Sequence, residues 1–187
     1  MQHVIKEELG LCPVNSFLAE HRLIERVIPV IEGEVRCIQA EHHLHFPVLD
    51  DLLEFLRSYV QDYHQQREEI ILFELLSKKQ LATDHRTKLQ EFIDSHTYER
   101  QLFENLLAAK KAYDEGAPDV LEELCKGFQA LIEFYPLHLH NEDRYFWLFG
   151  KTYLSHFDNM AILRKFYQAE ISSVYTLDII PRIALYI

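Results

Sequence analysis

The chain has 187 residues, of which 48% are hydrophobic and 26% are charged, and its formal net charge is -11. This length and composition suit one globular domain with a single core, and the acidic balance argues against nucleic acid or an anionic membrane as a partner. No apolar run is long enough to cross a bilayer, and the amino-terminal stretch "MQHVIKEELG" carries charges where a signal peptide is apolar. We therefore expect a cytoplasmic protein. Its cysteines Cys12, Cys37 and Cys125 form no close pair in the sequence, so we expect reduced thiols.

Apolar residues recur at intervals of three and four through four long segments, which is typical of amphipathic helices. The first helix is expected over about 15–45, with Asn15 or Ser16 as its amino-terminal cap and a bend at Pro29. The second helix is expected over about 47–78, because a proline at its start is well suited to the first helical turn.

A turn separates the third and fourth predicted helices. The third is expected over about 86–115 and ends at Gly116, since glycine readily adopts the left-handed conformation that terminates a helix. Asp119 is expected to cap the fourth helix, which reaches about Gly150 with a kink at Pro136. Short connections make neighbouring helices antiparallel, so the sequence predicts an all-α fold, an up-and-down antiparallel four-helix bundle.

A helical extension follows at the carboxyl end. A fifth helix is expected over about 155–172, and the apolar tail "VYTLDIIPRIALYI" comes after it. This tail could pack back on its own bundle or take part in a partner interaction. We expect one domain over residues 1–187, with a bundle core over about 14–153 and an extension over about 154–187.

Two of the predicted helices carry a histidine followed four residues later by a glutamate. The pairs are His64 with Glu68, in "HQQREEIILFELL", and His138 with Glu142, in "HLHNEDRYFWLFG". Residues four apart share one face of a helix, and in both stretches an apolar run follows the glutamate. Both pairs are therefore expected to point into the middle of the bundle.

The other two helices carry one such histidine each. His21 lies in "FLAEHRLIER" and His96 in "FIDSHTYERQ", and the distance between them, 96 − 21 = 75, nearly equals the distance between His64 and His138, 138 − 64 = 74. We interpret these nearly equal distances as a sign that the four histidines lie at the same depth in the bundle. Four imidazoles and two carboxylates without a thiolate suit iron, manganese or zinc. The alternative is four core histidines that neighbouring acids satisfy, but four on four helices favour metal, because unpaired buried charges are costly.

The stretches "EHRLIER", "HQQREEIILF", "SHTYER" and "HLHNEDRYFW" together resemble the hemerythrin-like (HHE) cation-binding domain, in the same order and at similar spacings. The resemblance covers roughly residues 14 to 170. It implies a four-helix bundle with a non-heme diiron centre, in which the two glutamates bridge the iron ions. The ligands that it implies are His21, His64, Glu68, His96, His138 and Glu142.

The chain departs from the oxygen-carrying members of this family at two positions. Arg100 stands where they have a second histidine on the third helix, and their fourth-helix acid is one residue further along, which here would select Asp143 instead of Glu142. The first departure puts simple oxygen carriage in doubt, because it removes a terminal ligand. Arg100 could be an outer group of the site or a salt-bridged flanking residue. Glu25, one turn after His21, is a candidate for an extra carboxylate ligand.

The resemblance and the motifs lead to a functional hypothesis. We expect a non-heme diiron protein that binds or reacts with a small ligand, namely O2, NO or peroxide, and that holds two iron ions, with other divalent metals as alternatives. The alternative function is an iron-handling or sensor module that signals to a partner or supports iron-sulfur repair. Whether the protein is an enzyme stays open. The chain has no flavin, nicotinamide or cysteine-rich motif, so reduction would need a redox partner protein.

Overall fold

The computed structural model describes residues 13–42, 44–117, 120–172 and 178–187. Every regular element within these ranges is a helix, which confirms the all-α prediction. No helix in the described part of the chain is long and apolar enough to span a membrane.

The first long helix, α2, spans Val14–Glu41. Pro13 directly precedes the helix, so the predicted caps Asn15 and Ser16 lie inside its first turn. No side chain caps the helix by a hydrogen bond. The prediction of Asn15 or Ser16 as the cap was therefore wrong. The helix continues through Pro29 and ends at His42, which has a left-handed φ of 51°.

The second long segment is not a regular α-helix, although the sequence periodicity predicts one. The hydrogen bonds from the Gln66 N–H to the Gln61 carbonyl and from the Glu74 N–H to the Glu69 carbonyl span five residues, which is the π-helical pattern. π-helical turns of this kind occur often at functional sites. The parts of the segment are α3 (Phe46–Glu54), η1 (Phe55–Gln65), η2 (Glu68–Phe73) and α4 (Glu74–Ser77).

The third and fourth long helices are α5 (Thr83–Asp114) and α6 (Val120–Tyr153). Gly116, which follows the last residue of α5 and its cap Glu115, has a φ of 79°, as predicted for a residue that ends a helix. The predicted cap Asp119 lies outside the described residues.

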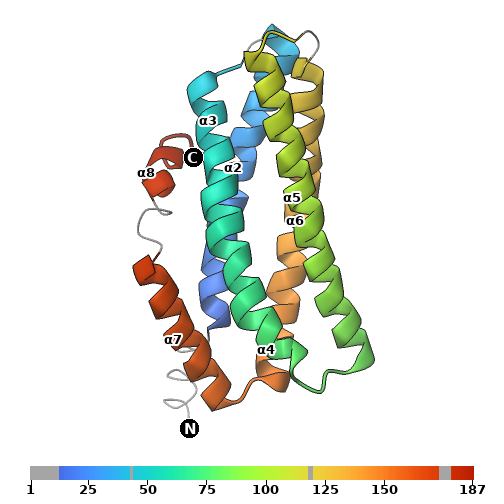
Figure 1. The fold of residues 1–187 in the computed structure, drawn as a ribbon, viewed down its shortest axis with the longest axis vertical. Helices are drawn as coiled ribbons and strands as arrows, with labels where there is room; N and C mark the ends of the chain where they lie inside the picture. Colours follow the sequence, from blue (N-terminus) through green and yellow to red (C-terminus); the bar gives the residue numbers. More distant parts are fainter. Residues whose placement is uncertain (1–12, 43, 118–119, 173–177) are drawn as a thin grey trace.

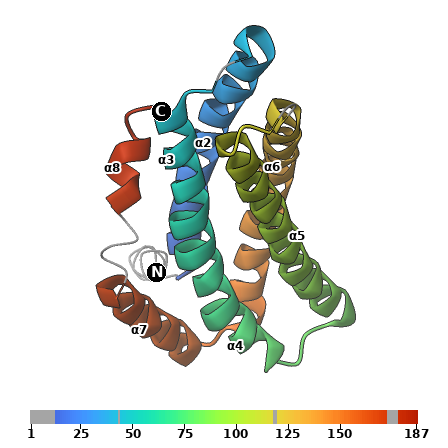
Figure 2. The same cartoon turned by 45° about the horizontal axis from the view of Figure 1, so that its top comes forward.

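Four long helical segments lie side by side along the long axis of the molecule: α2, the segment from α3 to α4, α5 and α6 (Figure 1). The extension contains α7 (His156–Ser172) and α8 (Ile179–Ile183). Both views show these two helices outside the set of four, beside the α3 to α4 segment (Figure 2). The described part of the tail thus packs back on its own chain. Arg182 and Tyr186 contact the Asp51 carboxylate of α3, the tyrosine hydroxyl at 2.9 Å.

The apolar core has two parts, to which all four long segments contribute. The upper core, on the side of the carboxyl end of α2, includes Ile24, Val60, Phe103 and Leu131, with Ile179 and Ile183 from α8. The lower core includes Phe17, Ile71, Phe92 and Phe146, with Ile162 and Phe166 from α7. On each long segment a set of buried polar residues lies between these two apolar parts. We call this set the polar layer; it contains His21, His64, Glu68, His96, His138 and Glu142.

Candidate metal centre

The six predicted ligands come together in the polar layer. All are buried, and His138, at 8% exposure, is the most accessible. Every long segment contributes to the set: His21 lies in α2, His64 in η1, Glu68 in η2, His96 in α5, and His138 and Glu142 in α6.

These residues form two groups, in each of which one potential ligand atom per residue lies within 4.8 Å of the others. The first group contains His21, His64, Glu68 and Glu142, and the second contains His96, His138 and Glu142. Glu142 therefore belongs to both groups.

The two carboxylates lie between the imidazoles of the two groups. Glu68 Oε1 lies 3.3 Å from His21 Nε2 and 3.5 Å from His64 Nε2, while its Oε2 lies 3.3 Å from His96 Nε2. Glu142 Oε2 lies 3.2 Å from His138 Nε2 and 3.6 Å from His21 Nε2, while its Oε1 lies 3.2 Å from His96 Nε2. Each glutamate thus faces imidazoles of both groups.

The protonation of the four histidines divides them into two pairs. Burial lowers the pKa of His64 to about 3 and that of His138 to about 4, so both are neutral near pH 7 and have a free lone pair. Burial acts in the same direction on His21 and His96, but the adjacent carboxylates outweigh it and raise the pKa of both imidazoles. The carboxylates thus favour the protonated form of these two imidazoles, so a cation entering the layer would compete with protons there.

Three buried atoms of this layer have no hydrogen-bond partner: His64 Nε2, Glu68 Oε2 and Glu142 Oε2. Buried polar atoms without partners are costly, and imidazole nitrogen and carboxylate oxygen are common metal ligands. The layer offers nitrogen and oxygen but no thiolate, a donor set suited to iron, manganese or zinc. The residues present therefore fit the kind of metal that the motifs predict.

Three of the imidazoles have a carboxylate behind them that holds the Nδ1 atom. Such a partner keeps the proton on Nδ1 and directs Nε2 toward the centre of the layer. These contacts are His21 with Asp143 at 2.6 Å, His64 with Glu20 at 2.8 Å, and His96 with Glu69 at 2.8 Å. His138 differs, since its Nδ1 lies 3.1 Å from the Ser95 hydroxyl.

An arginine lies behind each of these three carboxylates. The pairs are Asp143 with Arg22, Glu20 with Arg67, and Glu69 with Arg100. Arg22 and Arg100 have side chains that are 55% and 36% exposed, whereas that of Arg67 is 5% exposed. Arg100 thus forms a partly exposed ion pair with Glu69, whose carboxylate also contacts His96.

The two acids that the sequence left open both lie outside the set of six. Glu25 accepts hydrogen bonds from Arg22 at 2.6 and 2.5 Å on the surface of α2. Asp143 contacts His21 from the outer side, through Nδ1, while Glu142 faces the interior.

Sequence reasoning missed Glu20 and Glu69, although each is adjacent to a predicted ligand. Consecutive residues in a helix point about 100° apart, so each of these two glutamates contacts a histidine of another segment. Glu20 follows this rule by contacting His64, and Glu69 by contacting His96. No local motif indicates such a contact, because it depends on how the helices pack.

Glu99 is a further buried carboxylate that the sequence did not indicate. It accepts hydrogen bonds from the Tyr135 hydroxyl at 2.9 Å, Gln61 Nε2 at 3.1 Å and Gln65 Nε2 at 3.2 Å. Burial raises the pKa of Glu99, and burial together with the Glu99 charge raises the pKa of Tyr135. This cluster lies one helical turn from His96, toward the upper core.

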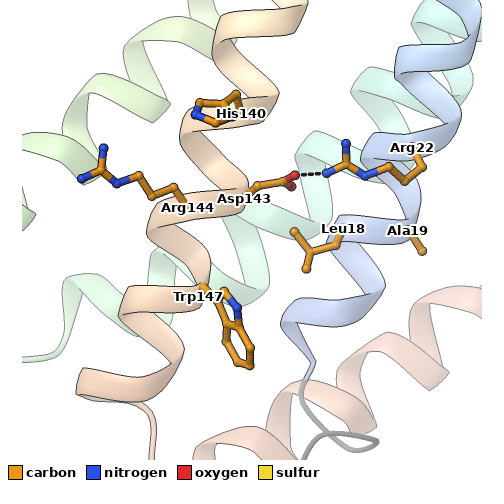
Figure 3. A pocket seen from close by; sticks show the side chains of 7 residues that line it. All are labelled: Leu18, Ala19, Arg22, His140, Asp143, Arg144 and Trp147. Carbon is orange, nitrogen blue, oxygen red and sulfur yellow. Dashed lines mark hydrogen bonds and ion pairs between the residues drawn. The ribbon is translucent and has the colours of Figure 1, made fainter.

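Two surface pockets approach the polar layer. One, of about 570 Å³, lies between α2 and α6, and Figure 3 shows Asp143 reaching from α6 toward Arg22 across it. Asp143, the outer partner of His21, is therefore open to solvent. The other pocket, of about 250 Å³, is lined by Ser95 and His138 and connects the surface with one of the predicted ligands.

The helical fold and the buried histidines and glutamates define a protein with a candidate cation-binding centre. The family model for the hemerythrin HHE cation binding domain matches residues 12–147. The chain belongs to this family, which confirms the resemblance seen in its motifs. The match ends before α7 and α8 begin.

The chain is also similar to uncharacterized proteins of Mycobacterium tuberculosis and Mycobacterium bovis, to which it is 26% identical over 141 residues. The match covers 74% of this chain and 53% of each of these proteins, so the chain spans about half the length of the curated relatives it matches. No solved structure matches the chain.

Proposed function

We propose that this chain is a non-heme diiron protein in which α2, the α3 to α4 segment, α5 and α6 form one up-and-down four-helix bundle around two iron ions. Other divalent metals are alternatives at the same site. The proposed ligands are His21, His64, Glu68, His96, His138 and Glu142.

The observation that carries this proposal is the division of the ligands into two groups with carboxylates between them. A single ion needs one group of donors, whereas Glu142 belongs to two groups and Glu68 faces histidines of both. Glutamates that face two sets of imidazoles are suited to bridge two ions.

The proposed chemistry is binding or reduction of O2, NO or peroxide. Iron, when bound, would supply the electrons and the open coordination position for such a ligand. The second group has three residues where the first has four, and its His138 lines the pocket between α5 and α6. Rings of Phe73 and Phe134 stack on His96 and His138 at 5.5 and 4.7 Å and limit the access of water on this side. A partner protein would supply electrons for repeated reduction.

Metal analysis of purified protein after anaerobic reconstitution with ferrous iron tests the proposal. We expect about two iron ions per chain and, after oxidation, absorption bands of a carboxylate-bridged ferric pair. A single tightly bound zinc ion without redox activity would contradict it. Release of the iron on oxidation, without consumption of O2, NO or peroxide, would favour the iron-handling alternative.

A further inference from the structure

We infer that α7, which lies beyond the family match, clamps the metal centre, and that its Phe166 is a positioning residue that acts on His64 through Arg67 and Glu20. The inference rests on the proposed function and deepens it, because it makes the carboxyl-terminal extension part of the site.

The contact between α7 and His64 passes through two charged side chains. Glu20 uses one carboxylate oxygen to hold His64 Nδ1 at 2.8 Å and the other to accept a hydrogen bond from Arg67 Nη1 at 2.7 Å. The position of the Arg67 guanidinium therefore decides where the Glu20 carboxylate lies, and the carboxylate in turn orients the imidazole.

Three aromatic rings surround the Arg67 guanidinium, of which the Phe17 ring is the most distant, at 6.0 Å. The central carbon of the guanidinium lies 4.4 Å from the centre of the Tyr63 ring and 4.2 Å from that of the Phe166 ring. Its Nε is buried without a hydrogen-bond partner, so the rings supply the contacts on that part of the group. An arginine over an aromatic face is stabilised most when water is excluded, and Phe166 itself is only 4% exposed.

The burial of Arg67 distinguishes its ion pair with Glu20 from the ion pairs that Arg22 and Arg100 form. Arg22 and Arg100 bind their carboxylates at the surface, where water weakens the attraction, whereas Arg67 and Glu20 are 5% and 7% exposed. A hydrogen bond between buried groups is costly to lose, because no water replaces the missing partner. Phe166 comes from α7, so this helix covers the pair and keeps it dry. Of the three carboxylate-backed histidines, His64 is thus the one whose orientation depends on the extension.

Release of iron from the full chain measures this dependence. Ferrous protein is mixed anaerobically with a coloured iron chelator, and the rate of metal loss is compared for the wild type, Phe166→Ala and Tyr167→Ala. Tyr167 is the matched control, since it is the next residue of α7 and is 67% exposed. We expect Phe166→Ala to release iron about tenfold faster, as for loss of other outer partners of metal-bound histidines, and Tyr167→Ala to match the wild type. Phe166→Leu keeps an apolar side chain but loses the aromatic face, so we expect its rate of iron release to lie between those of Phe166→Ala and the wild type. If Phe166→Ala does not fold, Phe166→Leu replaces it in the comparison.

A double-mutant cycle with Arg67→Gln separates this role from a general loss of packing. If Phe166 acts through Arg67, Phe166→Ala accelerates iron release in the wild type but adds little in the Arg67→Gln background. Equal acceleration in both backgrounds, or a Phe166→Ala rate equal to that of Tyr167→Ala, would overturn the inference and leave the proposed function intact. A wild-type chain that retains no iron would overturn the proposed function as well.

Discussion

Glu142 and Asp143 are adjacent, yet they contact different nitrogens of His21, because consecutive helical residues point about 100° apart. Glu142 is completely buried among the imidazoles, whereas the Asp143 side chain is 20% exposed and contacts the outer nitrogen of His21. We therefore expect Glu142→Ala to abolish binding of the second ion, since this carboxylate faces both groups. Asp143→Asn should keep two ions and weaken their binding by about 10- to 100-fold. Metal titration with elemental analysis measures both effects, and loss of an ion in Asp143→Asn alone would reverse the assignment.

Three hydrogen-bond donors satisfy the buried Glu99 carboxylate. Tyr135→Phe removes the donor at 2.9 Å and leaves the carboxylate in the core with two amides. We expect this variant to lower the free energy of unfolding by about 1–2 kcal/mol. Denaturant unfolding measures the change, and Tyr98→Phe is the control, because Tyr98 is 52% exposed. Equal stability of the two variants would mean that the Tyr135 hydroxyl contributes nothing.

The sequence was sufficient to predict which residues come together at the centre of the polar layer, but not the residues that contact them from outside. His64 and Glu68 share a helix and a face, so their contact at 3.5 Å follows from local spacing alone. His64 and Glu20 are 44 residues apart and come from different segments, so their contact depends on how α2 packs against η1. Binding of metal by these residues stays a prediction.

At the scale of the elements, α7 is anchored at its first turn. Ser155 and Asp158 form a reciprocal cap, in which the Ser155 N–H donates to the Asp158 carboxylate at 2.8 Å and the Asp158 N–H lies 3.2 Å from the Ser155 hydroxyl. Lys79 adds an ion pair at 2.7 Å. We expect Asp158→Ala to lower the free energy of unfolding by about 1 kcal/mol, measured by chemical denaturation. Asp84→Ala is the control, since Asp84 lies in the first turn of α5 and is 81% exposed.

The same cap should show a defined pH dependence. The hydrogen bonds from Lys79 and Ser155 lower the pKa of Asp158 from 3.8 to about 2. A carboxyl group whose pKa is lowered by folding stabilises the native state above its unfolded pKa and loses this contribution as the pH falls toward the folded value. The difference in stability between the wild type and Asp158→Ala should therefore shrink between about pH 4 and pH 2. A constant difference across this window would mean that the charge of Asp158 is not involved.

Helix positions were easier to predict than helix geometry. The fifth helix, expected over about 155–172, is found at His156–Ser172, and Gly116 follows the third helix as expected. The π-helical turns of η1 and η2 were not predicted, because apolar periodicity indicates which residues are buried but not which carbonyl each N–H contacts. The first cap was missed because Asn15 and Ser16 were favoured by residue type, whereas the helix already begins at Val14.

For the whole molecule, bound metal should contribute to stability. Three buried polar atoms of the polar layer make no hydrogen bond within the protein, and ions that bind only the folded chain stabilise it by mass action. We expect chelation to lower the melting temperature by roughly 5–10 °C, which corresponds to about 2.7 kcal/mol at a metal concentration 100 times the dissociation constant. Calorimetry with and without chelator measures this shift. An unchanged melting temperature after verified loss of metal would place the metal outside the polar layer.

The division of the core into two parts has a consequence for how the chain opens. Apolar packing is continuous within the upper core and within the lower core, but it is interrupted between them by the polar layer. Without metal, the two ends are coupled by the continuous backbone and by the hydrogen bonds and ring contacts of the polar layer rather than by apolar packing. Each end should therefore open more readily by itself than a continuous core would. Amide hydrogen exchange should then differ between residues around Phe103 and residues around Phe92, which lie on the same helix in different parts of the core. Two bridged ions would join the units, and the exchange rates at the two ends of α5 would converge on that of global unfolding.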